Sequence, residues 1–509
     1  MAWAKQYKVD GFRFDLMGHH MKRNILKLRA ALDALTLAAD GVDGKKIYIY
    51  GEGWNFGEVA NNARGVQATQ ANMAGTGIGT FNDRLRDGVR GGGPFSGIQE
   101  QGFLNGLYTD PNATNQGSAA DQLNTLLLRT DWVRTGLAGA IRDFQLEDRN
   151  GNLVEAQQID YNGQPAGYTL DPQEVISYIE AHDNETLWDS IAAKAPVGTS
   201  IEQRVRMQNL GMSLLAFGQG IPFYHAGVEL LRSKSMDRNS YNSGDWFNKL
   251  DFTYQSNNWG VGLPPATDNQ ANWPVMQPLL ANPALKSGPA AIQDAYAHFQ
   301  EALAIRKSTP LFRLRTGDQV KEKVRFHNTG PDQIPGMIVM SVTDEAGDAD
   351  RAHDRLVVVL NASDETQNFT LAEFQGAPLS LHPLQAASAD AVTRASSFNA
   401  TFGTFSVPGR TAAVFWSFRA VTDQIELLIA DVDALLAAGE ISGGHANTLK
   451  AKLRAALKQA ERGNLTAAAN QLQAFAVQVH VFQTQGFVPH DAAQAMIDNA
   501  NAAVSQIGG

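Results

Sequence analysis

The first 55 residues of the chain alternate between strand-like and helix-like patterns. Residues 7–15 (YKVDGFRFD) and 46–51 (KIYIYG) are short runs rich in aromatic and β-branched residues, which predicts two strands. Between them, residues 21–39 carry apolar side chains at helical spacing. Strands that alternate with helices of this length predict an α/β fold built from parallel βα units.

The same alternation returns further along the chain, after a segment of a different kind. Residues 55–115 are rich in Gly, Asn and Gln and show weak periodicity, so we expect a long loop that contributes to a binding site. Beyond this loop the patterns predict helices and strands in turn. The helices are expected near 123–134, 201–217 and 295–306, and the strands near 175–181 and 221–225.

The character of the chain changes twice more. After Pro310, short alternating runs such as 336–342 and 411–416 are separated by turn residues, which predicts an antiparallel β-sandwich. From residue 421 the sequence is rich in Ala, Leu and Gln with apolar stripes at helical spacing, which predicts a bundle of three or four helices. Coiled-coil dimerisation is the other interpretation of such stripes, but the helices are too short for sustained heptads. We therefore expect three domains, over residues 1–309, 310–420 and 421–509.

Composition excludes several classes of function. The formal net charge is −10 and no basic run of five residues occurs, whereas nucleic-acid binding needs a basic surface. The chain has no cysteine, which excludes disulfides and thiolate metal sites. No run of 18 apolar residues is present, so we expect no membrane span.

Three carboxylates follow predicted strands directly. Asp15 ends the run GFRFD, Glu52 follows YIYG, and Asp183 ends YIEAHD. In parallel βα folds the carboxyl ends of the strands converge on one face, where active sites form. Each residue alone also fits a structural role, because Asp15 or Asp183 could cap a helix and Glu52 could pair with an arginine.

The neighbours of these carboxylates strengthen the functional interpretation. Arg13 precedes Asp15 by two residues, so in a strand both side chains point to the same side. A guanidinium in that place keeps a carboxylate ionised, as a nucleophile requires. Glu52 lies between Gly51 and Gly53, which we expect to leave room for a ligand.

Two further side chains next to the carboxylates suit a sugar ligand. Trp54 follows Glu52 by two residues and offers a surface on which a sugar ring could stack, and His182 offers a hydrogen-bond donor beside Asp183. The remaining histidines, such as His19 and His225, are expected to pack or to orient loops.

Four segments together resemble one family. GFRFDLMGHH, YGEGWNFGE and EAHDNETLWD are similar to three segments of the α-amylase superfamily of glycoside hydrolases, and specifically of its type I pullulanase branch. Residues 220–251 are similar to the pullulanase version of the eighth barrel strand and its loop. The resemblance covers roughly residues 3–416. It implies a partial (β/α)8 TIM barrel, from about the fourth strand onward, followed by a β-sandwich and the helical bundle.

The resemblance also assigns roles to the site residues. Asp15 would be the nucleophile, Glu52 the general acid and base, and Asp183 would stabilise the transition state. Arg13 and His182 would hold the nucleophile and the sugar. Further substrate contacts would be Trp54, Asn239 and Tyr241, although the family position that matches Asn239 is often an aspartate.

Part of the family pattern has no counterpart in this sequence. The D-x-V-x-N-H motif is missing, no Asn-His dipeptide occurs, and the tyrosine-rich debranching signature is absent. We therefore expect about five of eight barrel strands, and an inactive fragment is one interpretation. The helical tail resembles a small module appended to secreted bacterial hydrolases; a spacer role and a carbohydrate or cell-surface attachment role both stay open.

The resemblance predicts retaining hydrolysis of α-1,6 branch linkages in pullulan, amylopectin and limit dextrins. An α-1,4-glucan hydrolase is the alternative within the superfamily, disfavoured by the segment SKSMDRNSYNSGDW at 233–246. A non-catalytic α-glucan-binding remnant is the alternative from another class. We expect no required cofactor, possible calcium binding, an α-glucan partner, a monomer, and a secreted or cell-surface location in a bacterium.

Overall fold

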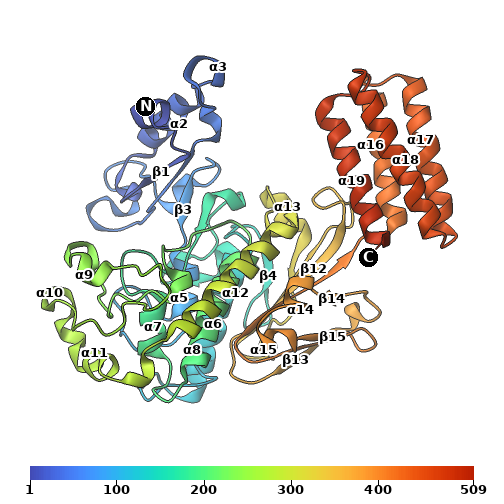
Figure 1. The fold of residues 1–509 in the computed structure, drawn as a ribbon. Coiled ribbons are helices and arrows are strands. Elements are labelled where there is room, and N and C mark those ends of the chain that lie inside the picture. The colour runs from blue at the N-terminus through green and yellow to red at the C-terminus, as the bar shows by residue number, and fades with distance from the viewer. Residues whose placement is uncertain (509) are drawn as a thin grey trace. The chain divides into compact units, whose positions relative to one another are not determined.

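The computed structural model describes residues 1–508 (Figure 1). Two compact units make up this part of the chain. The first contains residues 1–341, 357–377 and 381–414, and the second contains residues 342–356, 378–380 and 415–508. The candidate site residues Asp15, Glu52 and Asp183 all belong to the first unit.

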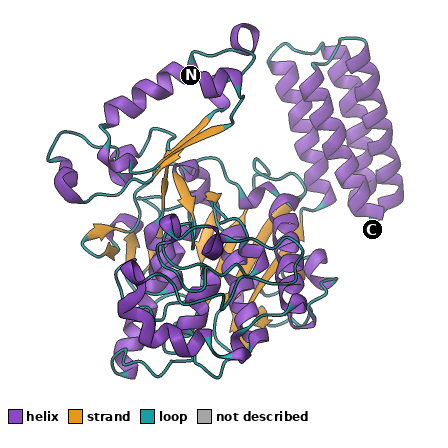
Figure 2. Ribbon diagram, turned by 60° about the vertical axis from the view of Figure 1, so that its left-hand side comes forward, coloured by secondary structure: helices purple, strands orange, loops and turns teal. Residues whose placement is uncertain are grey.

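The first unit contains a five-stranded parallel sheet, drawn in orange in Figure 2. The strand order is β1-β2-β3-β8-β9, and the neighbouring strands are parallel. The register places Phe14 opposite Gly51, so the residues that follow, Asp15 and Glu52, leave adjacent strands side by side. The strands are β1 Gly11–Phe14, β2 Tyr48–Gly51, β3 Gly79–Phe81, β8 Val175–Ser177 and β9 Ile221–Pro222.

Helices connect these strands, so the expected mixed α/β fold is confirmed. Polar side chains cap the N-termini of α5, α6, α7 and α8 by accepting backbone hydrogen bonds. Before α6, for example, Ser118 and Asp121 form a reciprocal capping box. The longer helices are α2 Lys22–Asp33, α5 Asp83–Arg90, α6 Ala119–Leu137, α7 Leu187–Lys194, α8 Ile201–Phe217, α11 Trp273–Leu280 and α12 Pro289–Ser308. Short helices are α1 Ala2–Gln6, α3 Leu37–Asp40, α4 Gln70–Met73, α9 Asp245–Asn248, α10 Ala266–Asn269 and α13 Gly317–Lys323.

The expectation of one long loop over residues 55–115 was wrong. The segment contains β3 and α5, and β3 lies between β2 and β8 in the middle of the sheet. Periodicity missed both elements for physical reasons. Strand β3 has only three residues, and α5 buries polar side chains, including Arg84, Arg86 and Asp87, where an apolar stripe would be expected.

Several expected boundaries also shift. The first strand begins at Gly11, and the strand expected over 175–181 ends at Ser177. The helix expected over 21–39 ends at Asp33, because Thr36 caps a separate helix, α3, by accepting a hydrogen bond from Ala39 N.

Two further sheets follow in the chain. One has the strand order β10-β11-β12-β17-β14, and the other has the order β13-β16-β15 with antiparallel neighbours. Their strands are β10 Val324–Phe326, β11 Met337–Thr343, β12 His353–Asn361, β13 Gln367–Thr370, β14 Ser380–Leu381, β15 Ser397–Asn399, β16 Thr404–Val407 and β17 Thr411–Phe418. Short helices α14 Pro383–Ala386 and α15 Ala391–Arg394 lie between them in the chain. Two small antiparallel pairs precede these sheets, β4 Gln145–Glu147 with β5 Leu153–Glu155, and β6 Asp160–Tyr161 with β7 Gln164–Pro165.

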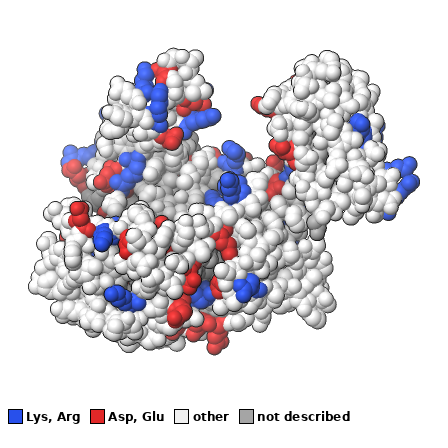
Figure 3. Space-filling model, viewed as in Figure 1, with Lys and Arg blue, Asp and Glu red and all other residues white. Residues whose placement is uncertain are grey.

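Four helices end the chain and pack on one another, as Figure 1 shows in red: α16 Val421–Ala437, α17 Gly443–Glu461, α18 Leu465–Thr484 and α19 His490–Gly508. Their stripes form one apolar core with Leu428, Leu449, Leu472 and Phe475. Helix α18 has no Lys, Arg, Asp or Glu, and Figure 3 shows one bundle face with few charged side chains. Within residues 1–508, no helix has the length and apolarity to span a membrane.

Candidate active site

Arg13 links the two carboxylates that leave β1 and β2. Its Nη2 lies 3.0 Å from Glu52 Oε1, and its Nη1 lies 3.8 Å from Asp15 Oδ1. The other Glu52 oxygen, Oε2, accepts a hydrogen bond of 2.9 Å from Leu16 N. Leu16 has a φ of 82°, a left-handed turn immediately after β1 that aims this N–H across to the neighbouring strand. The glutamate is therefore fixed through both oxygens.

The glycines beside Glu52 do not leave space for a ligand, and that expectation was wrong. A Cβ on Gly51 would lie 2.5 Å from Phe14 O, and one on Gly53 would lie 2.8 Å from Gln70 N. Both glycines allow protein backbones to approach closely. Gly18 does the same, because a Cβ there would lie 2.1 Å from Trp54 O.

Asp15 and Glu52 differ sharply in their surroundings. The Glu52 side chain is 7% exposed and that of Asp15 is 75% exposed. Burial and, after it, the hydrogen bond with Asp15 raise the pKa of Glu52 to about 8, although the charge of Arg13 acts in the opposite direction. The same hydrogen bond to Glu52, together with the charge of Arg13, lowers the pKa of Asp15. These opposite shifts in pKa favour a protonated Glu52 beside an ionised Asp15.

Asp183 lies beyond the end of β8, with its side chain about half exposed. Its negative charge is among the influences that raise the pKa of Glu52, and the neighbouring His182 lowers the pKa of Asp15. The His182 Nε2 is 3.5 Å from Asp183 Oδ1. The structure thus brings all three predicted carboxylates, with Arg13 and His182, into one electrostatic neighbourhood.

Lys234 supports the segment that carries Asp183, and sequence reasoning missed it. Its Nζ donates hydrogen bonds to the carbonyls on either side of Asp183, at 2.8 Å to His182 O and 2.6 Å to Asn184 O. The residue is fully buried, and its backbone N–H donates to Asp189 Oδ2 at 2.8 Å. No local pattern signals this role, because the lysine lies about 50 residues away along the chain.

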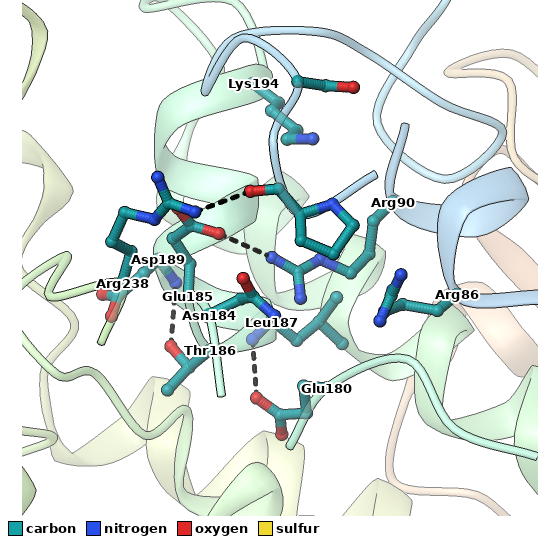
Figure 4. Close-up of polar contacts among 12 residues, drawn as sticks. Arg86, Arg90, Glu180, Asn184, Glu185, Thr186, Leu187, Asp189, Lys194 and Arg238 are labelled. Carbon is teal, nitrogen blue, oxygen red and sulfur yellow. Dashed lines mark hydrogen bonds and ion pairs between the residues drawn. The ribbon is translucent and has the colours of Figure 1, made fainter. Parts of the chain in front are cut away.

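A second set of contacts fixes the residues that follow Asp183, as Figure 4 shows. Arg90 forms an ion pair of 3.1 Å with Glu185, and Glu180 Oε2 accepts a hydrogen bond of 2.6 Å from Leu187 N. Lys194 lies nearby and donates to Gly91 O, and burial lowers its pKa to about 7. Segment 180–187 is therefore held from several sides, which keeps the position of Asp183 well defined.

The remaining predicted substrate contacts lie around this centre. Trp54 packs against the cluster of Phe81 and Tyr178 and stays partly exposed. The backbone of Asn239 pairs with that of Asp183 in an isolated antiparallel bridge. Tyr241 follows on the same loop and is 79% exposed. Across residues 1–508, no group of three or more His, Asp or Glu side chains could hold a metal ion.

Known proteins match the chain over most of its length. Residues 254–417 match the family of alpha-1,6-glucosidases, pullulanase-type, C-terminal, and residues 425–505 match the FIMAH domain. Pullulanase 1, chloroplastic, of Arabidopsis thaliana is 47% identical over 82% of this chain and 44% of its own length. The chain is homologous to the C-terminal portion of the pullulanases.

Other pullulanases agree with that assignment. The pullulanase of Klebsiella pneumoniae is 42% identical over 81% of this chain and 37% of its own length. A crystal structure of the maltotriose complex of PulA from Klebsiella pneumoniae has a TM-score of 0.75 and 39% identity, covering 82% of this chain and 44% of that one. The chain thus spans less than half the length of these relatives, which are glycoside hydrolases by name.

Proposed function

We propose that this chain carries the catalytic carboxylates of a hydrolase that cleaves α-1,6 branch linkages in pullulan, amylopectin and limit dextrins. One observation carries the proposal: Asp15 and Glu52 leave adjacent parallel strands and Arg13 contacts both carboxylates, while the pKa of Glu52 is raised and that of Asp15 is lowered. An ionised carboxylate beside a protonated one is the pair that glycoside hydrolysis requires. The α-1,6 specificity that we propose comes from the names of the matching family and relatives, which are alpha-1,6-glucosidases and pullulanases.

The geometry supports a retaining mechanism. Glu52 donates its proton to the glycosidic oxygen as that bond breaks, while Asp15 attacks the anomeric carbon and forms a glycosyl ester. The ionised Glu52 then takes a proton from water, which displaces Asp15 and releases the sugar. Retaining enzymes hold their carboxyl groups about 5–5.5 Å apart, against about 6.5–9.5 Å in inverting enzymes. Asp15 and Glu52 follow paired positions on neighbouring strands, whose backbones lie about 4.8 Å apart, which favours the shorter separation.

We assign the other site residues to the substrate. Asp183, next to the pair but separately held, stabilises positive charge that develops on the sugar in the transition state. His182, Trp54, Asn239 and Tyr241 contact the glucan around the scissile bond. The two carboxylates and water suffice for the reaction, so we propose that it needs no cofactor, and calcium binding stays a prediction.

The fold assignment extends this proposal. We infer that the five-stranded sheet corresponds to part of a (β/α)8 barrel, because its strands are parallel and alternate with helices, and because β1, β2 and β8 precede the three carboxylates. We further assign the two sheets within residues 324–418 to a β-sandwich domain, with boundaries near 310 and 420. A monomer and a secreted or cell-surface location remain part of the proposal.

The test is release of maltotriose from pullulan by the complete protein that carries this sequence, beside an Asp15→Asn variant. The proposal expects release that the variant abolishes. Cleavage of α-1,4 linkages alone would favour an amylase-like enzyme, and binding of pullulan with no release would favour a glucan-binding protein.

A further inference from the structure

A pocket of about 430 Å³ lies beside α9, at some remove along the chain from the carboxylates. This volume is within the range of about 300–1,000 Å³ that small-molecule sites occupy. None of the site residues that the sequence predicts lines it. The lining side chains are Asp245, Trp246, Asn248, Lys249, Asn258 and Val261.

Trp246 forms the aromatic wall of this pocket. It is 65% exposed, yet its position is fixed. Its Nε1 donates a hydrogen bond of 2.9 Å to Val261 O, and its own carbonyl accepts one of 3.1 Å from Asn258 Nδ2. A ring that is already held in place loses little conformational entropy when a ligand stacks on it.

The polar side chains around the indole suit a neutral, hydroxyl-rich ligand. Asp245 supplies hydrogen-bond acceptors and Lys249 supplies donors, so both functions of a sugar hydroxyl find partners. The formal charges of these two residues cancel, which favours neither an anionic nor a cationic ligand. An exposed indole face beside such groups matches the apolar face and the hydroxyl edge of a glucose unit.

Backbone contacts connect the pocket to the candidate active site. Asn248 Nδ2 donates to Ser240 O at 3.0 Å, which ties α9 to the loop that begins at Asn239. The backbone of Asn239 pairs with that of Asp183. Along this loop, the exposed Tyr241 lies between Asn239, which contacts the candidate active site, and the pocket beside α9.

We infer that the pocket is a further α-glucan-binding site, which holds a part of a malto-oligosaccharide chain remote from the bond that is cleaved. The ligand class rests on the proposed function; the pocket itself rests on the geometry of Trp246. Glucose units that pass Tyr241 reach this pocket, so it adds affinity for long chains and does not take part in bond cleavage.

The experiment measures the dissociation constant of maltohexaose by calorimetry in an Asp15→Asn background, where the ligand stays intact. Trp246→Ala weakens binding by about tenfold, the change expected when roughly one indole face no longer covers a ligand. Trp246→Phe keeps an aromatic face and most of the affinity. Trp3→Ala removes another exposed tryptophan, 60% exposed on α1, and leaves binding unchanged.

Three results overturn the inference: maltohexaose binding that neither Trp246 variant changes, an equal loss in Trp3→Ala, or equal Trp246-dependent binding of cellohexaose, a β-linked chain. Thermal unfolding of each variant shows whether it is folded. If Trp246→Ala is unfolded, the affinity of Trp246→Phe for maltohexaose and cellohexaose tests the inference instead. Failure of the proposed function is a separate result, namely no turnover by the protein with Asp15 intact. If binding depends on Trp246 but no turnover occurs, the glucan-binding pocket is supported and only the proposed hydrolase function is rejected.

Discussion

Arg13 contacts both carboxylates of the candidate pair, with Nη2 3.0 Å from Glu52 Oε1 and Nη1 3.8 Å from Asp15 Oδ1. Its positive charge lowers the pKa of both groups. Arg13→Gln should therefore move both limbs of the pH–rate profile to higher pH, and Arg13→Lys should move them less. Profiles of kcat/KM on pullulan test this relationship, and unchanged limbs in Arg13→Gln would show that Arg13 does not act on the pair.

The unmodified protein should show an asymmetric, bell-shaped pH profile. Activity requires an ionised Asp15, so it should fall only below the ordinary aspartate pKa of 3.8, because the pKa of Asp15 is lowered. It also requires a protonated Glu52, so it should fall as pH rises through about 8. The measurement is kcat/KM on pullulan over this range. An alkaline limb near the ordinary glutamate value of 4.5 would contradict the assignment of Glu52.

Glu52→Gln should separate the acid role from the nucleophile role. The variant cannot protonate a leaving group, so its rate on natural glucans should fall by about 10²–10⁴. An aryl α-glucan whose leaving group needs no proton should lose much less in the glycosylation step. Asp15→Asn is the matched control and should abolish turnover of both substrates, because no glycosyl ester can form. Equal losses on both substrates in Glu52→Gln would reject the acid assignment.

Lys234→Met should lower kcat without a comparable change in KM. The variant removes the two hydrogen bonds that Nζ donates around Asp183, while the backbone contact to Asp189 stays. A shift of about 1 Å in a catalytic group can cost on the order of a hundredfold in rate. Lys46→Met, at an exposed position, serves as the control. Normal kcat in a folded Lys234→Met protein would show that Asp183 does not depend on this lysine.

Deletion of the four-helix bundle after Ala420 should leave turnover on soluble pullulan nearly unchanged. The bundle has its own apolar core, and no residue of the candidate active site or of the Trp246 pocket lies beyond Val261. The deletion does leave Arg351 without Asp431, its partner at 2.9 Å. Asp431→Ala in the full chain therefore controls for that loss. A large fall in kcat with the fold intact would mean that the bundle supports the site.

The sequence could indicate that these three carboxylates lie near one another because their signal is local. Asp15, Glu52 and Asp183 each follow a recognisable apolar strand, and Arg13 lies two residues from its partner. Lys234 leaves no such signal, because it acts on carbonyls about 50 residues away. Likewise α5 escapes detection, since its buried side chains are polar and find their partners only in the folded protein.

The role of Gly51 shows a different limit. A glycine beside a candidate catalytic residue is compatible with an open ligand site and also with close packing of two backbones. Only the folded structure distinguishes these two explanations. Phe14 O lies where a side chain on Gly51 would go, so packing explains the residue. The ambiguity is one of tertiary contact, which local sequence does not encode.

The configuration of the first sugar released from pullulan tests the central claim most directly. The complete protein is mixed with pullulan in an NMR tube, and the anomeric signals of the product are followed before mutarotation, beside Asp15→Asn. Double displacement through Asp15 and Glu52 predicts maltotriose that appears first as the α-anomer and is absent with the variant. Maltotriose that appears first as the β-anomer, or α-anomer release that persists in Asp15→Asn, would contradict the account.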